Sequence, residues 1–238
     1  MKILVVNDDS ISAPGIAALA KAAAQFGETT VVAPEFQCSA LSQKLTLRQK
    51  LRVKRVEDFP VPVREAWQVD GTPVDCVKVA LDYVLKEKPD LVLSGINNGY
   101  NVGFDIAYSG TVGAAFEAAR QGIPAMAFSV ASNAHLSAAE NYLTEILREL
   151  LAERQDRGAV WNVNFPALNG KSLRGILRDR PVAQVGMYSE KYIETMDDDG
   201  CVALVCQGIP TEDSAIGAET DAAAVRQGCI SISRLRAY

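Results

Sequence analysis

The chain has 238 residues, 48% of them hydrophobic and 22% charged, and a formal net charge of −5 at pH 7. This composition is typical of one large globular domain, with room for an appendage, and excludes a disordered chain. The acidic balance and the scattered Lys and Arg residues argue against a nucleic-acid surface, and no apolar run approaches the roughly 20 residues of a membrane-spanning helix.

The cysteine and histidine content narrows the possible chemistry. The five cysteines are odd in number and widely spaced, and none forms a Cys-x-x-Cys motif: Cys38, Cys76, Cys201, Cys206 and Cys229. This pattern favours reduced thiols in a cytoplasmic protein, and we expect no secretory leader because strand-like residues begin at position 2. The only histidine, His135, is expected at the surface, and one histidine cannot build a His-based metal cluster.

The first predicted element is a buried strand of a parallel sheet over residues 2–6, because an apolar run there ends at polar residues. Asn7, Asp8 and Asp9 follow directly, at the strand end where ligands bind in open α/β sheets. Two adjacent carboxylates without a basic neighbour repel each other, which raises their pKa values unless a cation is bound. They are interpreted as half of a divalent-metal site, or alternatively as a turn with a helix cap.

A helix is expected next, with Ser12 as its cap, Pro14 in its first turn and Gly27 at its end, followed by a strand over residues 29–33. This strand–helix–strand order predicts a right-handed parallel α/β unit. No Gly-x-Gly-x-x-Gly follows the first strand, so the dinucleotide fingerprint is absent. Ser39 follows the second strand, and its hydroxyl belongs either to the same site or to a plain turn.

The next stretch predicts mixed elements. Alternating residues over 45–53 indicate an antiparallel strand or hairpin, and residues 66–69 form a short strand. A helix then begins with Thr72 as cap and runs to about Lys86. Residues 90–94 are a further buried strand.

The loop after that strand, residues 94–105, contains three Asn and three Gly residues. It offers amide oxygens and backbone N–H groups at the ligand edge, where Asn97 can reach a metal held by Asp8 and Asp9. The alternative is an ordinary turn.

Ser109, Gly110 and Thr111 open another helix, which ends at Gly122. Free N–H groups and the helix dipole favour a phosphate at such a start. The alternative is a Thr cap with close packing.

The last third of the chain completes the sheet and adds an appendage. We expect a strand at 123–129, a long helix opened by a capping box of Ser137 and Glu140, and a strand at 160–165. Polar residues at 185–200 predict a projecting hairpin or arm, in which Asp197, Asp198 and Asp199 are read as a solvated turn. Thr220 is expected to cap a short helix before a final strand at 229–233.

Four oxygen donors are thus expected at one sheet edge: Asp8, Asp9, Ser39 and Asn97. Two carboxylates, a hydroxyl and an amide suit Mg²⁺, Mn²⁺ or Ca²⁺ and do not suit zinc or copper. A helix start suited to phosphate lies one loop away. The candidate site contains no His, no Cys and no P-loop lysine. This combination predicts hydrolysis of a phosphoester by Lewis-acid activation.

At this point the chain resembles the SurE family of 5′-nucleotidases over essentially its whole length. The resemblance rests on the order and spacing of seven blocks, at residues 7–16, 33–40, 71–77, 90–99, 109–112, 162–166 and 228–233. Two departures are Ser10, where the family usually has Gly, and Ser233-Arg234-Leu235 in place of Thr-Pro-Leu.

The resemblance implies a Rossmann-like three-layer α/β/α sandwich with a mostly parallel sheet and a C-terminal hairpin. Residues 1–180 would form the catalytic core, and residues 181–238 an extension with the arm and the final strand. It implies cleavage of nucleoside 5′-monophosphates, with 3′-monophosphates and short polyphosphate as further candidate substrates. It also implies one Mg²⁺ or Mn²⁺ per subunit and a homodimer or homotetramer.

The family's metal ligands map onto Asp8, Asp9, Ser39 and Asn97, and the first two and Asn97 are assigned to catalysis. Asp8 is the preferred base or nucleophile, with water as the other candidate nucleophile. The residues expected to contact the substrate or its phosphate are Asn7, Gly95, Asn101, Ser109, Gly110 and Thr111.

Two rival functions are kept. A receiver-type signalling domain would need a phospho-accepting Asp after a third apolar strand and a later Lys, but Asp58 follows no such run and residues 123–134 lack Lys. A non-catalytic metal- or nucleotide-binding protein on the same fold is the second rival, and Ser10 is its only sequence hint.

Overall fold

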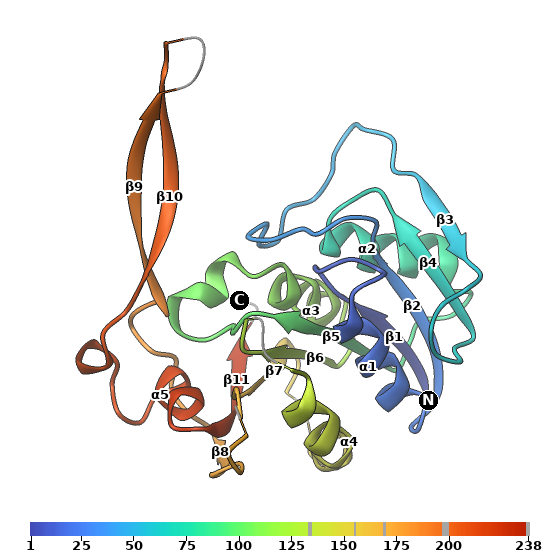
Figure 1. Cartoon of the computed structure of the whole chain (residues 1–238). Coiled ribbons are helices and arrows are strands. Elements are labelled where there is room, and N and C mark those ends of the chain that lie inside the picture. Colours follow the sequence, from blue (N-terminus) through green and yellow to red (C-terminus); the bar gives the residue numbers. More distant parts are fainter. Residues whose placement is uncertain (133–134, 155, 169, 197–199, 237–238) are drawn as a thin grey trace.

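The computed structural model describes residues 1–132, 135–154, 156–168, 170–196 and 200–236. Within these residues the main sheet has nine strands in the order β3-β4-β2-β1-β5-β6-β7-β11-β8, and β9 and β10 form a separate pair (Figure 1). The strands are β1 (Lys2–Val6), β2 (Glu28–Pro34), β3 (Val53–Val56), β4 (Glu65–Val69), β5 (Leu91–Asn98), β6 (Ala125–Val130), β7 (Ala159–Phe165), β8 (Gly175–Arg178), β9 (Tyr188–Met196), β10 (Val202–Pro210) and β11 (Cys229–Arg236).

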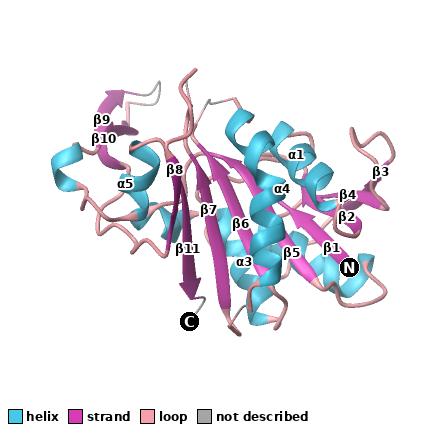
Figure 2. Cartoon of the chain, turned by 90° about the horizontal axis from the view of Figure 1, so that it is seen from below, coloured by secondary structure: helices cyan, strands magenta, loops and turns pink. Residues whose placement is uncertain are grey.

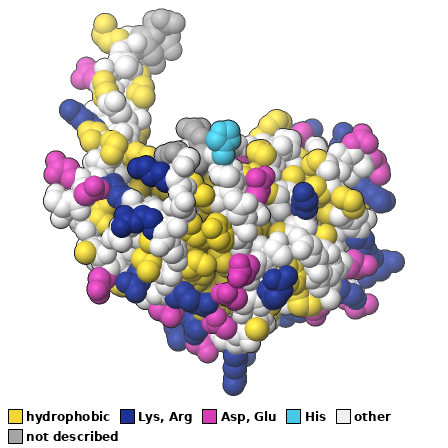
Figure 3. All heavy atoms as spheres, turned by 60° about the horizontal axis from the view of Figure 1, so that its bottom comes forward, with side chains coloured by type: hydrophobic (Ala, Val, Ile, Leu, Met, Phe, Trp, Pro, Cys, Tyr) yellow, Lys and Arg dark blue, Asp and Glu magenta, His cyan; other side chains and the backbone are white. Residues whose placement is uncertain are grey.

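The helices are α1 (Pro14–Ala23), α2 (Pro73–Val79), α3 (Gly110–Arg120), α4 (Ser137–Ala152) and α5 (Asp221–Arg226), with short 3-10 or π turns at Ala80–Val84, Gly103–Tyr108 and Asp213–Ala215. In the described residues, no helix combines the length and the apolar character needed to cross a membrane. Basic and acidic side chains are mixed over the face seen in Figure 3. His135 is exposed, as expected.

The six central strands, from β4 through β2, β1, β5 and β6 to β7, are all parallel. Antiparallel pairs flank this block, because β3 runs against β4 and β11 runs against β7. The predicted mostly parallel sheet is therefore confirmed. The last strand of the chain lies inside the main sheet, between β7 and β8.

Helices cover both faces of the sheet, which confirms the three-layer sandwich (Figure 2). Side chains of a strand alternate between the two faces. On β1, Ile3 and Val5 pack in the same core cluster as helices α1 and α4, whereas Leu4 and Val6 pack in the cluster that contains α2 and α3. The two clusters therefore lie on opposite faces of the sheet.

The hairpin of β9 and β10 projects from the sandwich, as the polar segment predicted (Figure 1). Every residue of β9 is exposed, and in β10 only Ala203 is partly covered. Asp197, Asp198 and Asp199 lie outside the described residues. Helix α5, capped by Thr220 as expected, packs near the base of the hairpin in a small cluster with Val102 and Ala183.

Several local predictions are wrong. Residues 45–52 form no strand, because the backbone N–H of Thr46 is donated to the Asp75 carboxylate at 3.0 Å instead of to a neighbouring strand. Ser12 does not cap α1, since its hydroxyl pairs with that of Ser10 at 3.1 Å. Ser137 is not a cap either, because Leu136 precedes α4 without a side-chain bond.

The predicted helix to about Lys86 is shorter than expected. Thr72 caps it with the expected capping box, but α2 ends at Val79 and continues only as a π-helical turn. Strand β8 was not predicted, because only four residues form it and none of them is fully buried.

Candidate metal and phosphate site

The candidate site lies where β2, β1 and β5 end side by side. These three strands are neighbours and parallel, so their carboxyl ends meet at one edge of the sheet. Asp8 and Asp9 follow β1, Ser39 follows β2, and Asn97 is near the end of β5. Two hydrogen bonds tie the three loops together there. The backbone N–H of Cys38 donates to the Asp8 carbonyl at 2.7 Å, and the N–H of Asn98 donates to Asp9 Oδ2 at 2.8 Å.

Asp8 is directed toward the start of α3. It is 4% exposed, and it accepts hydrogen bonds from both the hydroxyl and the backbone N–H of Thr111, the latter at 3.2 Å. A Cβ on Gly110 would lie only 3.1 Å from the Asp8 carboxylate, so glycine lets the helix start approach this side chain. The metal-type carboxylate and the phosphate-type helix start are therefore in direct contact.

Burial raises the pKa of Asp8 to about 6, against the lowering effect of the Thr111 hydroxyl, and the negative charge of Asp9 adds to the rise. Asp9 is less buried, and its pKa is also raised by burial, while the bonds from Asn98 and Gln37 oppose the rise. In the part of the chain that the structure describes, neither carboxylate forms an ion pair with Lys or Arg. Two neighbouring carboxylates with this electrostatic environment are suited to a bound cation.

The remaining two donors are neutral oxygens. Ser39 is exposed beside Cys38. Asn97 is half-buried and donates its Nδ2 to the Gly99 carbonyl at 2.8 Å, which leaves Oδ1 as its acceptor. Among the described residues, no group of three or more His, Cys, Asp and Glu side chains is placed to hold a metal. A metal at this edge would therefore need the hydroxyl and amide oxygens in addition to the two carboxylates, which fits a hard cation.

All six predicted substrate residues are buried, including the three that lie outside the start of α3. Asn7 is fully buried and donates to the Ser10 carbonyl at 2.7 Å, while its Oδ1 has no partner in the described structure. Gly95 is buried, and a Cβ at this position would lie 2.3 Å from the Phe128 carbonyl oxygen. Asn101 is 4% exposed. These three residues therefore lie inside the protein, beneath the surface of the site.

Ser109 is also 7% exposed, and its hydroxyl caps α3 by accepting the N–H of Val112 at 3.0 Å. The hydroxyl and the backbone N–H of Thr111 both donate to Asp8. The backbone N–H of Gly110, at the same helix start, takes no part in these bonds. Ser10 has φ of +100°, in the region that favours glycine. Its backbone thus keeps a glycine-type conformation although a serine stands there.

Sequence reasoning missed the asparagines that hold the loop of Asn97. In strand β7, Asn164 Oδ1 accepts the N–H of Asn101 at 2.8 Å, and Asn162 donates to the Asn101 carbonyl at 2.8 Å. The side chain of Asn101 donates in turn to Ser129 Oγ at 2.8 Å. The available signal was two asparagines at alternate positions of an otherwise apolar strand, which places both on one face.

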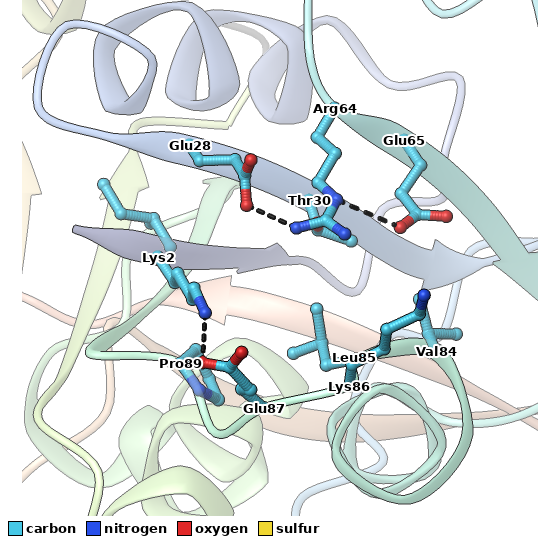
Figure 4. A pocket seen from close by; sticks show the side chains of 11 residues that line it. Lys2, Glu28, Thr30, Arg64, Glu65, Val84, Leu85, Lys86, Glu87 and Pro89 are labelled. Carbon is cyan, nitrogen blue, oxygen red and sulfur yellow. Dashed lines mark hydrogen bonds and ion pairs between the residues drawn. The ribbon is translucent and has the colours of Figure 1, made fainter.

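A pocket of about 460 Å³ opens beside Asp9, between the start of α1 and the ends of β5 and β6. A second, smaller cleft of about 70 Å³ lies at the opposite edge of the sheet, next to Lys2, the first residue of β1 (Figure 4). Its charged side chains neutralise one another, because Lys2 pairs with Glu87 and Arg64 pairs with Glu28. The smaller cleft is therefore separate from the candidate site.

Comparison with known proteins agrees with this geometry. The family model "Survival protein SurE" matches residues 3–190. The chain is 39% identical to the 5′-nucleotidase SurE of Gloeobacter violaceus, with 99% of this chain and 90% of that protein covered. It is 38% identical to the 5′/3′-nucleotidase SurE of Cronobacter sakazakii, with the same coverage. The crystal structure of the SurE protein from Aquifex aeolicus matches with a TM-score of 0.82 and 33% identity, over 100% of this chain and 94% of that one. The chain therefore belongs to the SurE family.

Proposed function

We propose that the protein is a metal-dependent 5′-nucleotidase that hydrolyses nucleoside 5′-monophosphates to nucleoside and phosphate. The observation that carries the proposal is the contact between Asp8, one member of the carboxylate pair, and the start of α3. A carboxylate pair suited to a cation, next to a helix start suited to an anion, fits a phosphoester substrate. The names of the relatives support the same reaction, and the name of the Cronobacter sakazakii relative adds 3′-monophosphates as further candidate substrates.

We assign one divalent cation per subunit, Mg²⁺ or Mn²⁺, to Asp8, Asp9, Ser39 and Asn97. All four are oxygen donors on neighbouring loops, which supports a hard cation. When bound, such a cation supplies Lewis-acid polarisation and charge neutralisation to the phosphoryl group.

The protein's own groups have three tasks in this proposal. The N–H of Gly110 and the dipole of α3 bind phosphoryl oxygens at the helix start. Thr111 holds the Asp8 carboxylate in place through two hydrogen bonds. Asp8, held in this orientation at the helix start, is the preferred acceptor for a proton of the attacking water.

We further propose that the hairpin of β9 and β10 assembles the protein into a homodimer or homotetramer. Large apolar side chains are exposed on both strands, including Met196 at 84%, Val202 at 65% and Leu204 at 60%. Apolar side chains gathered on a projecting element mark an interaction surface. The expected location is the cytoplasm, because the cysteines are odd in number and widely spaced.

The test is phosphate release from a panel of 5′- and 3′-nucleoside monophosphates with Mn²⁺, with Mg²⁺ and with EDTA. We expect release that requires metal and is lost in Asp9→Ala, whereas the matched control Asp82→Ala, at an exposed position of the π-helical turn, keeps wild-type activity. Absence of release with every metal, from a folded protein that still binds Mn²⁺, would instead support the non-catalytic binding protein.

A further inference from the structure

The pocket beside Asp9 is on the opposite side of the sheet edge from the proposed phosphate site. Asp8 is directed to α3, which packs on one face of the sheet, whereas Asp9 lines a pocket next to α1 on the other face. The carboxylate pair therefore reaches both the helix start, through Asp8, and the pocket, through Asp9.

The pocket has both apolar and polar walls and is formed by packed elements of the core. Pro14, Ile96, Val130 and Leu136 supply apolar wall, from α1, β5, β6 and the residue before α4. A Cβ on Gly15 would lie 2.1 Å from the Ile96 carbonyl, so α1 approaches β5 as closely as glycine permits. The volume of about 460 Å³ lies in the range of about 300–1,000 Å³ that is typical of small-molecule pockets.

One polar side chain connects the pocket to the candidate metal site. Gln37 lines the pocket and donates its Nε2 to Asp9 Oδ1 at 3.4 Å. The carbonyl oxygen of the same amide remains as an acceptor for a hydroxyl or an N–H of a ligand. Apolar side chains combined with a small number of placed polar groups are usual in a small-molecule pocket.

We propose that this pocket binds the nucleoside part of the substrate, with the base against Pro14, Val130 and Leu136 and with Gln37 as a polar contact. The proposal rests on the proposed nucleotidase function and adds the residues that recognise the nucleoside. The apolar side chains of the pocket favour burial of any base without selecting one, and Leu136 is the residue that the test replaces.

The test variant is Leu136→Trp, which places a larger side chain in the pocket. Its matched control is Leu81→Trp, since Leu81 is also a half-buried leucine and lines a different surface hollow on the other face. The substrates are nucleoside 5′-monophosphates and ribose 5-phosphate, which lacks the base. We expect Leu136→Trp to raise KM for the nucleotides at least tenfold and to lower their kcat/KM relative to ribose 5-phosphate by a similar factor. The control leaves both quantities at the wild-type values.

If folded Leu136→Trp keeps the wild-type ratio of kcat/KM for nucleotides to kcat/KM for ribose 5-phosphate, the pocket proposal is overturned while the nucleotidase function stays intact. Ala13→Leu narrows the same pocket at the residue that precedes α1, and serves if the Trp variant fails to fold. Equilibrium dialysis with the four ribonucleosides tests the pocket without turnover. Binding that is lost in the filled variants supports the pocket even for a protein that releases no phosphate, and absence of nucleoside binding to the wild type overturns it.

Discussion

Replacing Thr111 with Val removes one hydroxyl from the site and keeps the volume of the side chain. That hydroxyl donates to the Asp8 carboxylate, and it lowers the pKa of a group that burial raises to about 6. A hydrogen bond to a charged group contributes about 1.5–3 kcal/mol, and one pKa unit corresponds to about 1.4 kcal/mol. The bond favours the ionised carboxylate, so its loss raises the pKa of Asp8 further in the metal-free variant.

The consequence for metal binding depends on pH. At pH 6.5 the wild-type Asp8 carboxyl, with its pKa of about 6, is mostly ionised, and loss of about 1.5–3 kcal/mol in favour of the ionised form lowers its ionised fraction about three- to twenty-five-fold. A metal needs the ionised form, so we expect Thr111→Val to bind Mn²⁺ about three- to twenty-five-fold more weakly at pH 6.5. At pH 8.5 both proteins are largely ionised and the affinities converge.

Isothermal titration calorimetry with Mn²⁺ at the two pH values measures this difference. Thr111→Ser keeps the hydroxyl and is expected to follow the wild type at both. A Thr111→Val variant with wild-type affinity at pH 6.5, or with a loss that is equal at pH 6.5 and pH 8.5, would refute the electrostatic reasoning.

Three further predictions concern stability and assembly. In the metal-free protein the pKa of Asp8 is higher in the folded state than in the unfolded state, so folding stability falls as the pH rises through about 4 to 6. Asp8→Asn is therefore expected to increase the free energy of unfolding at pH 7 by at most about 3 kcal/mol, and so to raise the melting temperature, while abolishing activity. A lower melting temperature would contradict this. Gly15→Ala is expected to destabilise the fold by more than about 1 kcal/mol in urea unfolding, because the added Cβ meets the Ile96 carbonyl at 2.1 Å, and an unchanged midpoint would count against the close packing of α1 on β5. Leu204→Lys is expected to reduce the assembly size in light scattering without changing the circular dichroism of the core, and a wild-type assembly would show that this part of the hairpin is not covered by a partner.

The elements that sequence reasoning predicted well are those with a strong local signal. The apolar run of β1 and the apolar start of β5 are buried on both faces, so composition alone identified them. Thr72 and Thr220 cap their helices as expected because each cap bond joins residues three apart. The placement of Asp8 and Asp9 at the sheet edge followed from the parallel topology and needed no side-chain detail.

The predictions that differed from the structure depend on distant partners. The sequence also did not reveal that the backbone of Asn101 is bonded to Asn162 and Asn164, which are more than 60 residues away in the chain. Thr46 was placed in a strand by its alternating neighbours, yet its N–H is bonded to Asp75, 29 residues later. A single sequence holds no information that pairs such residues.

The exposed hairpin of β9 and β10 has a consequence for how the protein behaves on dilution. A two-stranded hairpin is marginally stable in water by itself, and this one has almost no covered residue. The nine-stranded sheet contains neither of its strands, so the core does not depend on it. Limited proteolysis should therefore cut the hairpin more readily as the protein concentration is lowered, whereas the sandwich should resist cleavage to the same degree at every concentration.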